Sequence, residues 1–267
     1  PDTLRYYLSI NMPEGHDTDF RWDEFVDRVN NELIATYGNF VHRVLTLVHK
    51  LPNDGTNPLT EFDLPDAHSD TWDIVDKHLG EAINSMEHQR FKEALRSIMN
   101  IAQLGNSILQ QAAPWKHLDG DDTPEARNSL SSLALAWRLC RGLAVSLRPF
   151  IPFQSDRLWG MLGELSDIDS ILLDAAFDPN SSLQWNESDP VPLFERLDLD
   201  TIIATERSLI DNQSHSKDND QSESPVDSET GYIEFEDFLK VEMKTGRILS
   251  VDDHPGADKL YVITIED

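Results

Sequence analysis

FKEALRSIMNIAQLGNSILQQAAPWK, residues 91–116, is a long amphipathic segment whose apolar pattern ends abruptly. Its apolar side chains recur every three or four positions, which predicts a helix from about residue 90 to residue 112. Pro114 lacks a backbone donor and disfavours helical geometry in the residue before it, so this helix should end near Ala113. Trp115 would then lie on a turn, with its ring free to offer a flat surface.

Similar stripes occur throughout residues 1 to about 210. They predict helices over residues 2–10, 23–47, 70–86 and 124–147, and a short helix through Phe153 and Leu162 after the breaks at Pro149 and Pro152. Amphipathic helices joined by short polar loops pack as an antiparallel bundle. We therefore expect a mainly α fold, with a helical bundle over residues 13–210.

The end of the chain has a different character. Residues 211–230 contain one apolar side chain, Val226, which is too little to offset the entropy of ordering, so we expect a disordered acidic linker. After Gly231, apolar runs at residues 248–251 and 260–265 flank a Pro-Gly turn and predict two β-strands joined by a loop. Two strands do not make a stable domain, so residues 231–267 are expected to begin a β-barrel that continues beyond Asp267.

The chain has 49 acidic and 22 basic residues, a formal net charge of −27. At ordinary salt such a surplus argues against a nucleic-acid partner, because phosphates are repelled. However, the acidic residues are spread along the whole chain, aspartate outnumbers glutamate and arginine outnumbers lysine, as expected for a very salty cytoplasm. There the Debye length falls to about 3 Å at 1 M salt, so recognition must rest on stacking and short hydrogen bonds. An acidic interaction protein at ordinary salt is the alternative.

Other features narrow the class of protein. The sequence has no basic and apolar leader and no apolar run near the roughly 18 residues of a membrane helix, so we expect a soluble, cytoplasmic protein with no membrane partner. Cys140 is the single cysteine and falls on an apolar stripe, so we expect a buried thiol, no internal disulfide and an intracellular setting. The chain begins at Pro1 without a methionine and ends inside an apolar alternation, which we interpret as a fragment cut at both ends.

Asn39 and Arg43 stand four residues apart on the second predicted helix and so project from one face. With Trp115 they supply an amide, a planar cationic fork and a stacking surface, the groups that recognise unpaired nucleic-acid bases. A packed structural tryptophan and a solvated polar pair on a helix surface are the plainer alternatives. Trp137 and Trp159 fall on apolar stripes and are expected in the core. The histidines lack the spacing of a metal site.

These residues belong to an ordered set of motifs: DTLRYYL at residues 2–8, DTDF at 17–20, GNFVHR at 38–43, APWK at 113–116, LRPFIP at 147–152 and LFERLD at 193–198. The set resembles the methionyl-tRNA synthetases over nearly all of residues 1–210. The resemblance implies that residues 1–12 join a catalytic domain and that residues 13–210 bind the CAU anticodon of methionine tRNA. It also implies that Pro114 and Trp115 belong to the RNA-binding site together with Asn39 and Arg43: Trp115 stacks on a splayed base, while Asn39 and Arg43 contact base edges and backbone.

The motifs FEDFLKV at 235–241, TGRI at 245–248 and HPGADKLYV at 254–262 resemble a tRNA-binding OB-type module that is appended to some synthetases. This second resemblance implies auxiliary tRNA affinity and, in some relatives, a homodimer. Lysine is rare in the chain, yet cations gather in this segment and could meet phosphates: Lys240, Lys244, Arg247 and Lys259.

The His-Ile-Gly-His and Lys-Met-Ser-Lys-Ser motifs that handle ATP in this family do not occur in these residues. The resemblance therefore implies a methionine–tRNA ligase, from a halophilic archaeon, whose ATP and Mg²⁺ sites and candidate zinc site lie upstream; we expect no catalytic residue, metal or cofactor in this part. Two rivals remain. A non-enzymatic tRNA-binding chaperone could carry the same terminal module, but it has no reason to keep residues 2–8. Another class I synthetase could have a similar bundle, but the combination of Asn39, Arg43 and Trp115 speaks against it.

Overall fold

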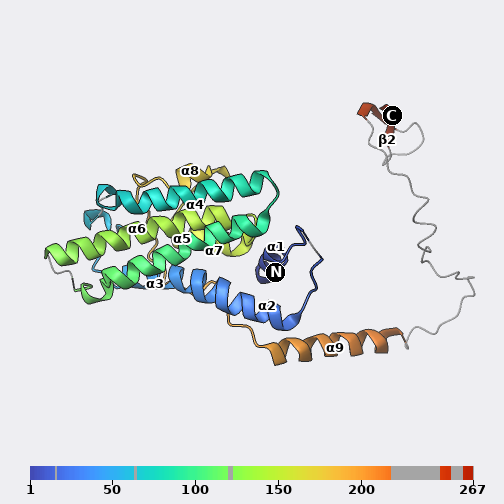
Figure 1. Ribbon diagram of the computed structural model, residues 1–267, viewed down its shortest axis with the longest axis horizontal. Coiled ribbons are helices and arrows are strands. Elements are labelled where there is room, and N and C mark those ends of the chain that lie inside the picture. The colour runs from blue at the N-terminus through green and yellow to red at the C-terminus, as the bar shows by residue number, and fades with distance from the viewer. Residues whose placement is uncertain (16, 63–64, 120–122, 218–246, 254–260, 267) are drawn as a thin grey trace, which may run out of the picture. The chain divides into compact units, whose positions relative to one another are not determined.

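The computed structural model describes residues 1–15, 17–62, 65–119, 123–217, 247–253 and 261–266, and the chain divides into two compact units, Pro1–Asn212 and Gln213–Asp267. The described part of the first unit is helical (Figure 1). Its elements are α1 (Asp2–Ile10), α2 (Trp22–Arg28), the π-helix η1 (Val29–Gly38), α3 (Asn39–Val48), α4 (Ser69–Glu87), α5 (Phe91–Ala112), α6 (Pro124–Leu147), α7 (Pro152–Met161), α8 (Leu173–Ala176) and the start of α9 (Leu199–Lys217). Four short 3₁₀ turns join them: η2 (Thr60–Phe62), η3 (Pro65–His68), η4 (Pro114–Lys116) and η5 (Ile168–Ser170).

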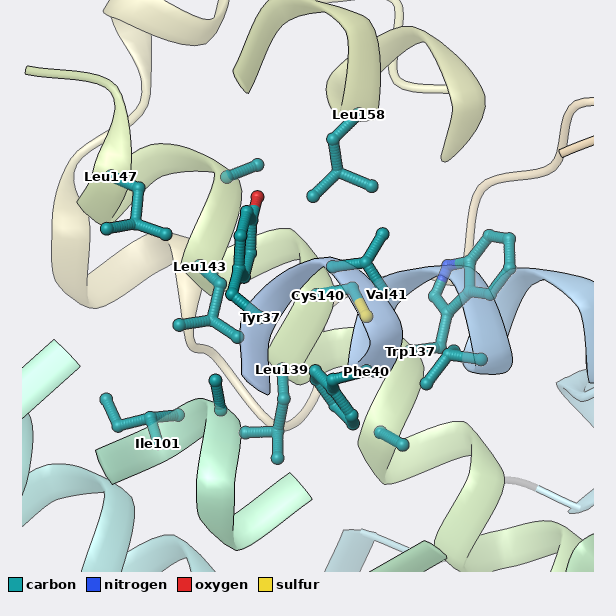
Figure 2. Close-up of a cluster of buried hydrophobic side chains, with 14 of the residues drawn as sticks. Tyr37, Phe40, Val41, Ile101, Trp137, Leu139, Cys140, Leu143, Leu147 and Leu158 are labelled. Atoms are coloured by element: carbon teal, nitrogen blue, oxygen red, sulfur yellow. The ribbon is translucent and has the colours of Figure 1, made fainter. Parts of the chain in front are cut away.

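The predicted helical bundle is confirmed, and its central helix is α6. Helices α3, α5 and α7 all pack against α6, and α4 packs on the other side of α5 (Figure 1). Figure 2 shows side chains of α6 meeting Tyr37 of η1 and Phe40 and Val41 of α3 in one apolar cluster. The contact between α3 and α6 matters for function, because α3 carries Asn39 and Arg43.

The core predictions are also confirmed. Trp137 and Trp159 are buried, as is Cys140, whose thiol has its pKa raised by burial. Among the described helices, α6 alone is long and apolar enough to cross a membrane by length and composition, and 89% of that apolar window is buried in the bundle. Its central position therefore accounts for its composition. Trp72, near the start of α4, is buried as well.

The helix predicted over residues 23–47 is a composite rod. It begins as α2, widens into the π-helix η1 and continues as α3. The apolar positions Val29, Leu33 and Tyr37 step by four, a spacing close to both helical periods, so periodicity could not distinguish them. π-Helical turns are rare, occur mostly as single turns inside α-helices, and are frequent at functional sites. Here the segment leads directly into Asn39.

The helix α9 corrects the predicted start of the linker. It runs to Lys217, seven residues beyond the bundle boundary placed at residue 210. At the start of α9 the Asp198 carboxylate accepts a hydrogen bond of 2.8 Å from the Thr201 amide and so caps the helix, and its pKa is lowered by hydrogen bonds from the Thr201 hydroxyl and amide. A polar helix can form without burying much surface, which apolar content alone did not reveal. The rest of the expected linker, residues 218–230, lies outside the described residues.

Two β-strands are described in the second unit, as predicted. β1 (Arg247–Asp253) pairs antiparallel with β2 (Tyr261–Glu266), in a register that places Val251 opposite Ile263 and has an irregularity between Ile248 and Ser250. The apolar side chains described in this ribbon are exposed: Ile248, Leu249, Val251, Tyr261, Val262 and Ile263. The wider expectation of an OB-type barrel over residues 231–267 stays a prediction.

Candidate nucleic-acid interface

The turn that carries Trp115 is built from the end of α5. Ala113 adopts a left-handed conformation (φ 47°, ψ 51°) and ends the helix, and Pro114 then opens η4. A non-glycine residue in this conformation costs about 1–2 kcal/mol, so the surrounding structure must hold it. Helix α6 helps to stabilise this conformation, because the buried Ser129 hydroxyl donates a 2.7 Å hydrogen bond to the Ala112 carbonyl. The helix thus stops where Pro114 predicts.

Pro114 is buried in the turn, and its expected contact with RNA stays a prediction. The resemblance groups it with the RNA-binding residues, and the burial of its pyrrolidine ring points to an indirect part in that site. Its effect is on Trp115, because its fixed φ and missing N–H set the direction in which the next residue leaves the helix. We therefore place Pro114 among the residues that position the site.

Trp115 lies on the surface and meets Arg43. Its side chain is 39% exposed, whereas Trp137 in the core is 2% exposed, so the structure excludes a fully packed structural tryptophan. The Arg43 Cζ atom lies 5.6 Å from the centroid of the indole ring. At an exposed site this cation–π contact contributes about 0.5–1 kcal/mol. The structure therefore brings together two of the predicted site residues, from segments more than seventy positions apart.

A small cavity opens beside this pair. Its volume is about 180 Å³, and it is lined by His42, Arg43, Thr46, Leu47 and Trp115. Ligand pockets for drug-sized molecules measure roughly 300–1,000 Å³, so this one suits a single planar ring system. Its walls combine an indole face, a guanidinium group and a leucine side chain, which favour a flat ligand with a polar edge.

His42 and Thr46 were missed by sequence reasoning. The Nδ1 atom of His42 and the Oγ1 atom of Thr46 are buried and have no hydrogen-bond partner within the described residues. Buried polar atoms are nearly always paired, so these two are exceptions; they lie behind the apolar surface that the cavity exposes. Their sequence signal was weak: they stand four residues apart on α3, next to Arg43, but a histidine and a threonine at this spacing are common on helices.

Asn39 is exposed on α3, one helical turn before Arg43, and does not line the cavity. It is therefore placed to contact a group adjacent to the one that enters the cavity.

The predicted auxiliary cations are not tested: Lys240, Lys244 and Lys259 lie outside the described residues, and Arg247 is described only as the first residue of β1. In the described part of the chain, no group of three or more His, Cys, Asp or Glu side chains could hold a metal ion.

The segments that build this surface carry no carboxylates. In a chain with 49 acidic residues, neither residues 33–53, which hold α3, nor residues 94–118, which hold most of α5 and the Trp115 turn, contain an aspartate or a glutamate. A carboxylate near an RNA phosphate is repulsive even at short range. The distribution thus separates this surface from the acidic remainder of the chain.

Comparisons with known proteins agree with this geometry. The family model described as tRNA synthetases class I (M) matches residues 1–45, and the one described as the anticodon binding domain of methionyl tRNA ligase matches residues 64–174. A methionine–tRNA ligase of Porphyromonas gingivalis is 34% identical over 278 residues, covering 100% of this chain and 38% of that protein. One of Methanopyrus kandleri is 30% identical over 267 residues, covering 99% of this chain and 36% of that protein. The chain thus spans less than two fifths of the length of these bacterial and archaeal relatives.

A solved structure has the same fold. The apo form of Mycobacterium tuberculosis methionyl-tRNA synthetase superposes with a TM-score of 0.60 at 21% identity, covering 74% of this chain and 39% of that one. The fold and the matched segments define the class: a helical anticodon-binding domain of a class I aminoacyl-tRNA synthetase. The class I match over residues 1–45 also disfavours the chaperone rival, which would not need this segment. The chain belongs to the methionyl-tRNA synthetase family and is its anticodon-binding portion.

Proposed function

We propose that this chain is the part of a methionine–tRNA ligase that binds methionine tRNA through its CAU anticodon. The single observation that carries the proposal is the half-exposed Trp115 ring beside Arg43 at a cavity large enough for one base. The remainder of the enzyme, bearing ATP, Mg²⁺ and any zinc, would attach methionine in the cytoplasm.

Each residue of the site has a distinct role in this proposal. Arg43 covers part of the indole, so a splayed base stacks on the ring surface that remains exposed and has the guanidinium at its side. Stacking on an aromatic side chain contributes roughly 1–3 kcal/mol per base. The Arg43 guanidinium then meets the polar edge of that base, and Asn39 contacts the neighbouring nucleotide.

Selectivity in this proposal comes from the polar side chains that border the ring. A base whose edge pairs with the Arg43 guanidinium and the Asn39 amide is held, whereas a base with the wrong edge leaves polar groups unpaired within the contact. An unpaired buried polar group costs about 1–3 kcal/mol. This supports recognition by exclusion of wrong bases, which does not depend on long-range charge.

We infer that the setting is a salty cytoplasm, as in a halophilic archaeon. The net charge of −27 would oppose tRNA binding at low salt, while about 1 M salt confines electrostatic effects to about 3 Å. The carboxylate-free segments around Trp115 fit this setting, because the short-range contacts are kept free of repulsion. In the second unit, Lys240, Lys244, Arg247 and Lys259 would add auxiliary tRNA affinity, with a homodimer as in some proteins that carry this module.

The experiment that tests the site is a binding measurement on the whole chain. The probe is an RNA hairpin with the CAU anticodon in its loop, compared with hairpins changed at one anticodon base. Trp115→Ala should weaken binding by about 1–3 kcal/mol, which is roughly five- to 150-fold. Trp115→Phe should retain most of the affinity and Trp115→Leu should not, because leucine keeps the apolar surface but cannot stack. Equal affinity of the alanine variant and the unsubstituted chain would refute the stacking role.

A further inference from the structure

A second cavity lies along the same helical rod, at the opposite end of α5 from Trp115. Its volume is about 230 Å³, and it opens between η1 and α5 beneath α1. The side chains that carry its chemistry are Tyr6, Arg28, Glu32, Arg96, Asn100 and Gln103. The residues come from several elements of the bundle, so the bundle itself assembles the site.

This cavity carries a net positive charge, whereas the chain as a whole is strongly acidic. Arg28 and Arg96 contribute two guanidinium groups from different elements, and Glu32 contributes one carboxylate, which leaves one net positive charge. Glu32 is already engaged, since Arg28 lies 2.9 Å from it and the Tyr6 hydroxyl donates to it at 3.2 Å. Arg96 is exposed and makes no ion pair within the described residues. A free arginine beside amide donors is a good receptor for an oxyanion.

The two cavities lie along one continuous strip. On the rod, Arg28, Glu32 and Thr36 border the second cavity, and Arg43 borders the first, with Asn39 between them. The Asn106 amide on α5 donates a 2.9 Å hydrogen bond to the Thr36 carbonyl and holds rod and helix together midway.

The length of the strip and its lack of carboxylates suit a nucleic-acid strand. From Arg96 to Ala112, α5 is about 24 Å long at a rise of about 1.5 Å per residue, which is enough for several nucleotides. Beyond Glu32 neither segment has a carboxylate until Asp54 and Asp119. The strip therefore links the base cavity to the arginine pair without a repulsive group between them.

We propose that Arg28 and Arg96 bind the phosphate backbone of the tRNA that flanks the anticodon. The ligand is a phosphodiester, held by the Arg96 guanidinium and by the outer side of Arg28, with Asn100 and Gln103 as neutral donors. This site rests on the proposed function and extends it, because it fixes the direction in which the RNA leaves the base cavity. It carries no sequence specificity, since phosphates are the same for every base.

The test substitutes both members of the Arg28–Glu32 ion pair and, in addition, Arg96. Binding of the whole chain to the CAU hairpin is measured over a range of KCl concentrations in which circular dichroism shows full helicity. Arg96→Gln and Arg28→Gln should each weaken binding several-fold and lower the slope of log affinity against log salt by about 0.7–0.9, the value for one phosphate contact. Glu32→Gln should tighten binding, because it removes the single carboxylate of the cavity. Arg157→Gln, at an exposed position on α7, is the matched control and should change neither quantity.

The proposal predicts opposite changes in RNA affinity for Arg28→Gln and Glu32→Gln, and this difference distinguishes it from a structural role of the ion pair. If the Arg28–Glu32 pair were only structural, Arg28→Gln and Glu32→Gln would weaken binding together, and that result would overturn the proposal. Unchanged salt slopes for both arginine variants would overturn it as well. Trp115→Ala keeps the two hypotheses apart: it should reduce discrimination between the CAU hairpin and hairpins changed at the stacked base, because that base is no longer held against the polar groups, whereas the arginine variants should weaken all hairpins equally. Loss of discrimination in Trp115→Ala with normal arginine variants would leave the anticodon function standing and refute the phosphate site alone.

Discussion

Replacing Gly105 with alanine should destabilise the bundle, although alanine is the better helix former. A Cβ atom at Gly105 would lie 2.3 Å from Cζ and 2.5 Å from Cε2 of Phe40, distances at which something must move. Phe40 is fully buried in the cluster of Figure 2, so its ring has little room to withdraw. Glycine at position 105 therefore lets α5 approach α3.

The magnitude follows from two opposed terms. Alanine gains about 1 kcal/mol over glycine inside a helix. Overpacking a core costs about 1–3 kcal/mol, and contact with several atoms of one rigid ring puts this site near the upper end. The net effect of Gly105→Ala is thus a loss of about 2 kcal/mol in the free energy of unfolding.

Gly80→Ala is the matched control, because Gly80 lies on the neighbouring helix α4 and a Cβ atom there would meet nothing within 4 Å. This variant should gain about 1 kcal/mol, so the two variants should differ by about 3 kcal/mol. In a domain of 150–250 residues that difference corresponds to roughly 6–12 °C in Tm.

Urea unfolding followed by far-ultraviolet circular dichroism, at constant KCl, measures the difference directly. Combining Gly105→Ala with Phe40→Leu should recover part of the loss, so the double variant should be more stable than the sum of the two single changes. The reasoning is refuted if Gly105→Ala and Gly80→Ala stabilise the chain alike. The RNA affinity of Gly105→Ala should also fall, because Phe40 adjoins Asn39 on α3.

Four further outcomes are expected. Ser129→Ala should lower the free energy of unfolding by about 1 kcal/mol and weaken hairpin binding, because the Ala112 carbonyl loses its hydrogen bond; urea titration and the binding assay check both. The thiol of Cys140, buried with a raised pKa, should resist a thiol reagent in the folded chain and react only in denaturant. Hydrogen bonding to Arg148 lowers the pKa of Asp169, so this stabilisation is complete above the ordinary aspartate pKa and is lost as the pH falls through the lowered value; Arg148→Gln should raise the Asp169 pKa in an NMR titration. Helicity should decline as KCl falls below about 1 M, since the carboxylates then repel one another, and full helicity in dilute buffer would argue against halophilic adaptation.

Much of the fold could be predicted because its elements are defined locally. Apolar periodicity marked the long helices, and proline chemistry marked both the end of α5 and the start of α7. The stripe through Trp137 and Cys140 correctly predicted burial, since only a central helix needs apolar residues on most of its faces. These predictions required no knowledge of what lies across the core.

The remaining features depend on partners that are distant in sequence. Arg138 donates hydrogen bonds of 2.6 and 3.1 Å to the Ser181 carbonyl, which fastens an irregular segment to α6. At Gly163, where φ is +81°, a Cβ atom would lie 2.3 Å from the Trp185 carbonyl oxygen. Neither contact has a periodic signal, so the path of residues 163–198 could not be predicted from pattern alone.

The candidate site likewise contains residues that could be predicted from the sequence and residues that could not. Trp115, Arg43 and Asn39 were predicted because their chemistry is visible in the side chain itself. His42 and Thr46 could be recognised only after the structure showed that their polar atoms are buried without partners among the described residues. The RNA contact expected of Pro114 stays a prediction; the structure shows that its ring is buried, which the sequence could not state, because it does not say which side of a turn faces the solvent.

The geometry of the site is determined by residues that have no affinity for RNA. The indole is aimed by a left-handed alanine, a buried proline and the Ser129 hydroxyl, and the Arg43 side of the cavity is placed by the close contact between Gly105 and Phe40. At high salt, long-range attraction cannot correct a misplaced group, because charges act over only a few ångströms. Stacking and short hydrogen bonds are steep functions of distance, so in the proposed high-salt setting the proposed anticodon site would obtain its selectivity from rigid packing. Substitutions in the core beneath α3 and the Trp115 turn should therefore reduce anticodon discrimination even where the RNA-contacting residues are intact.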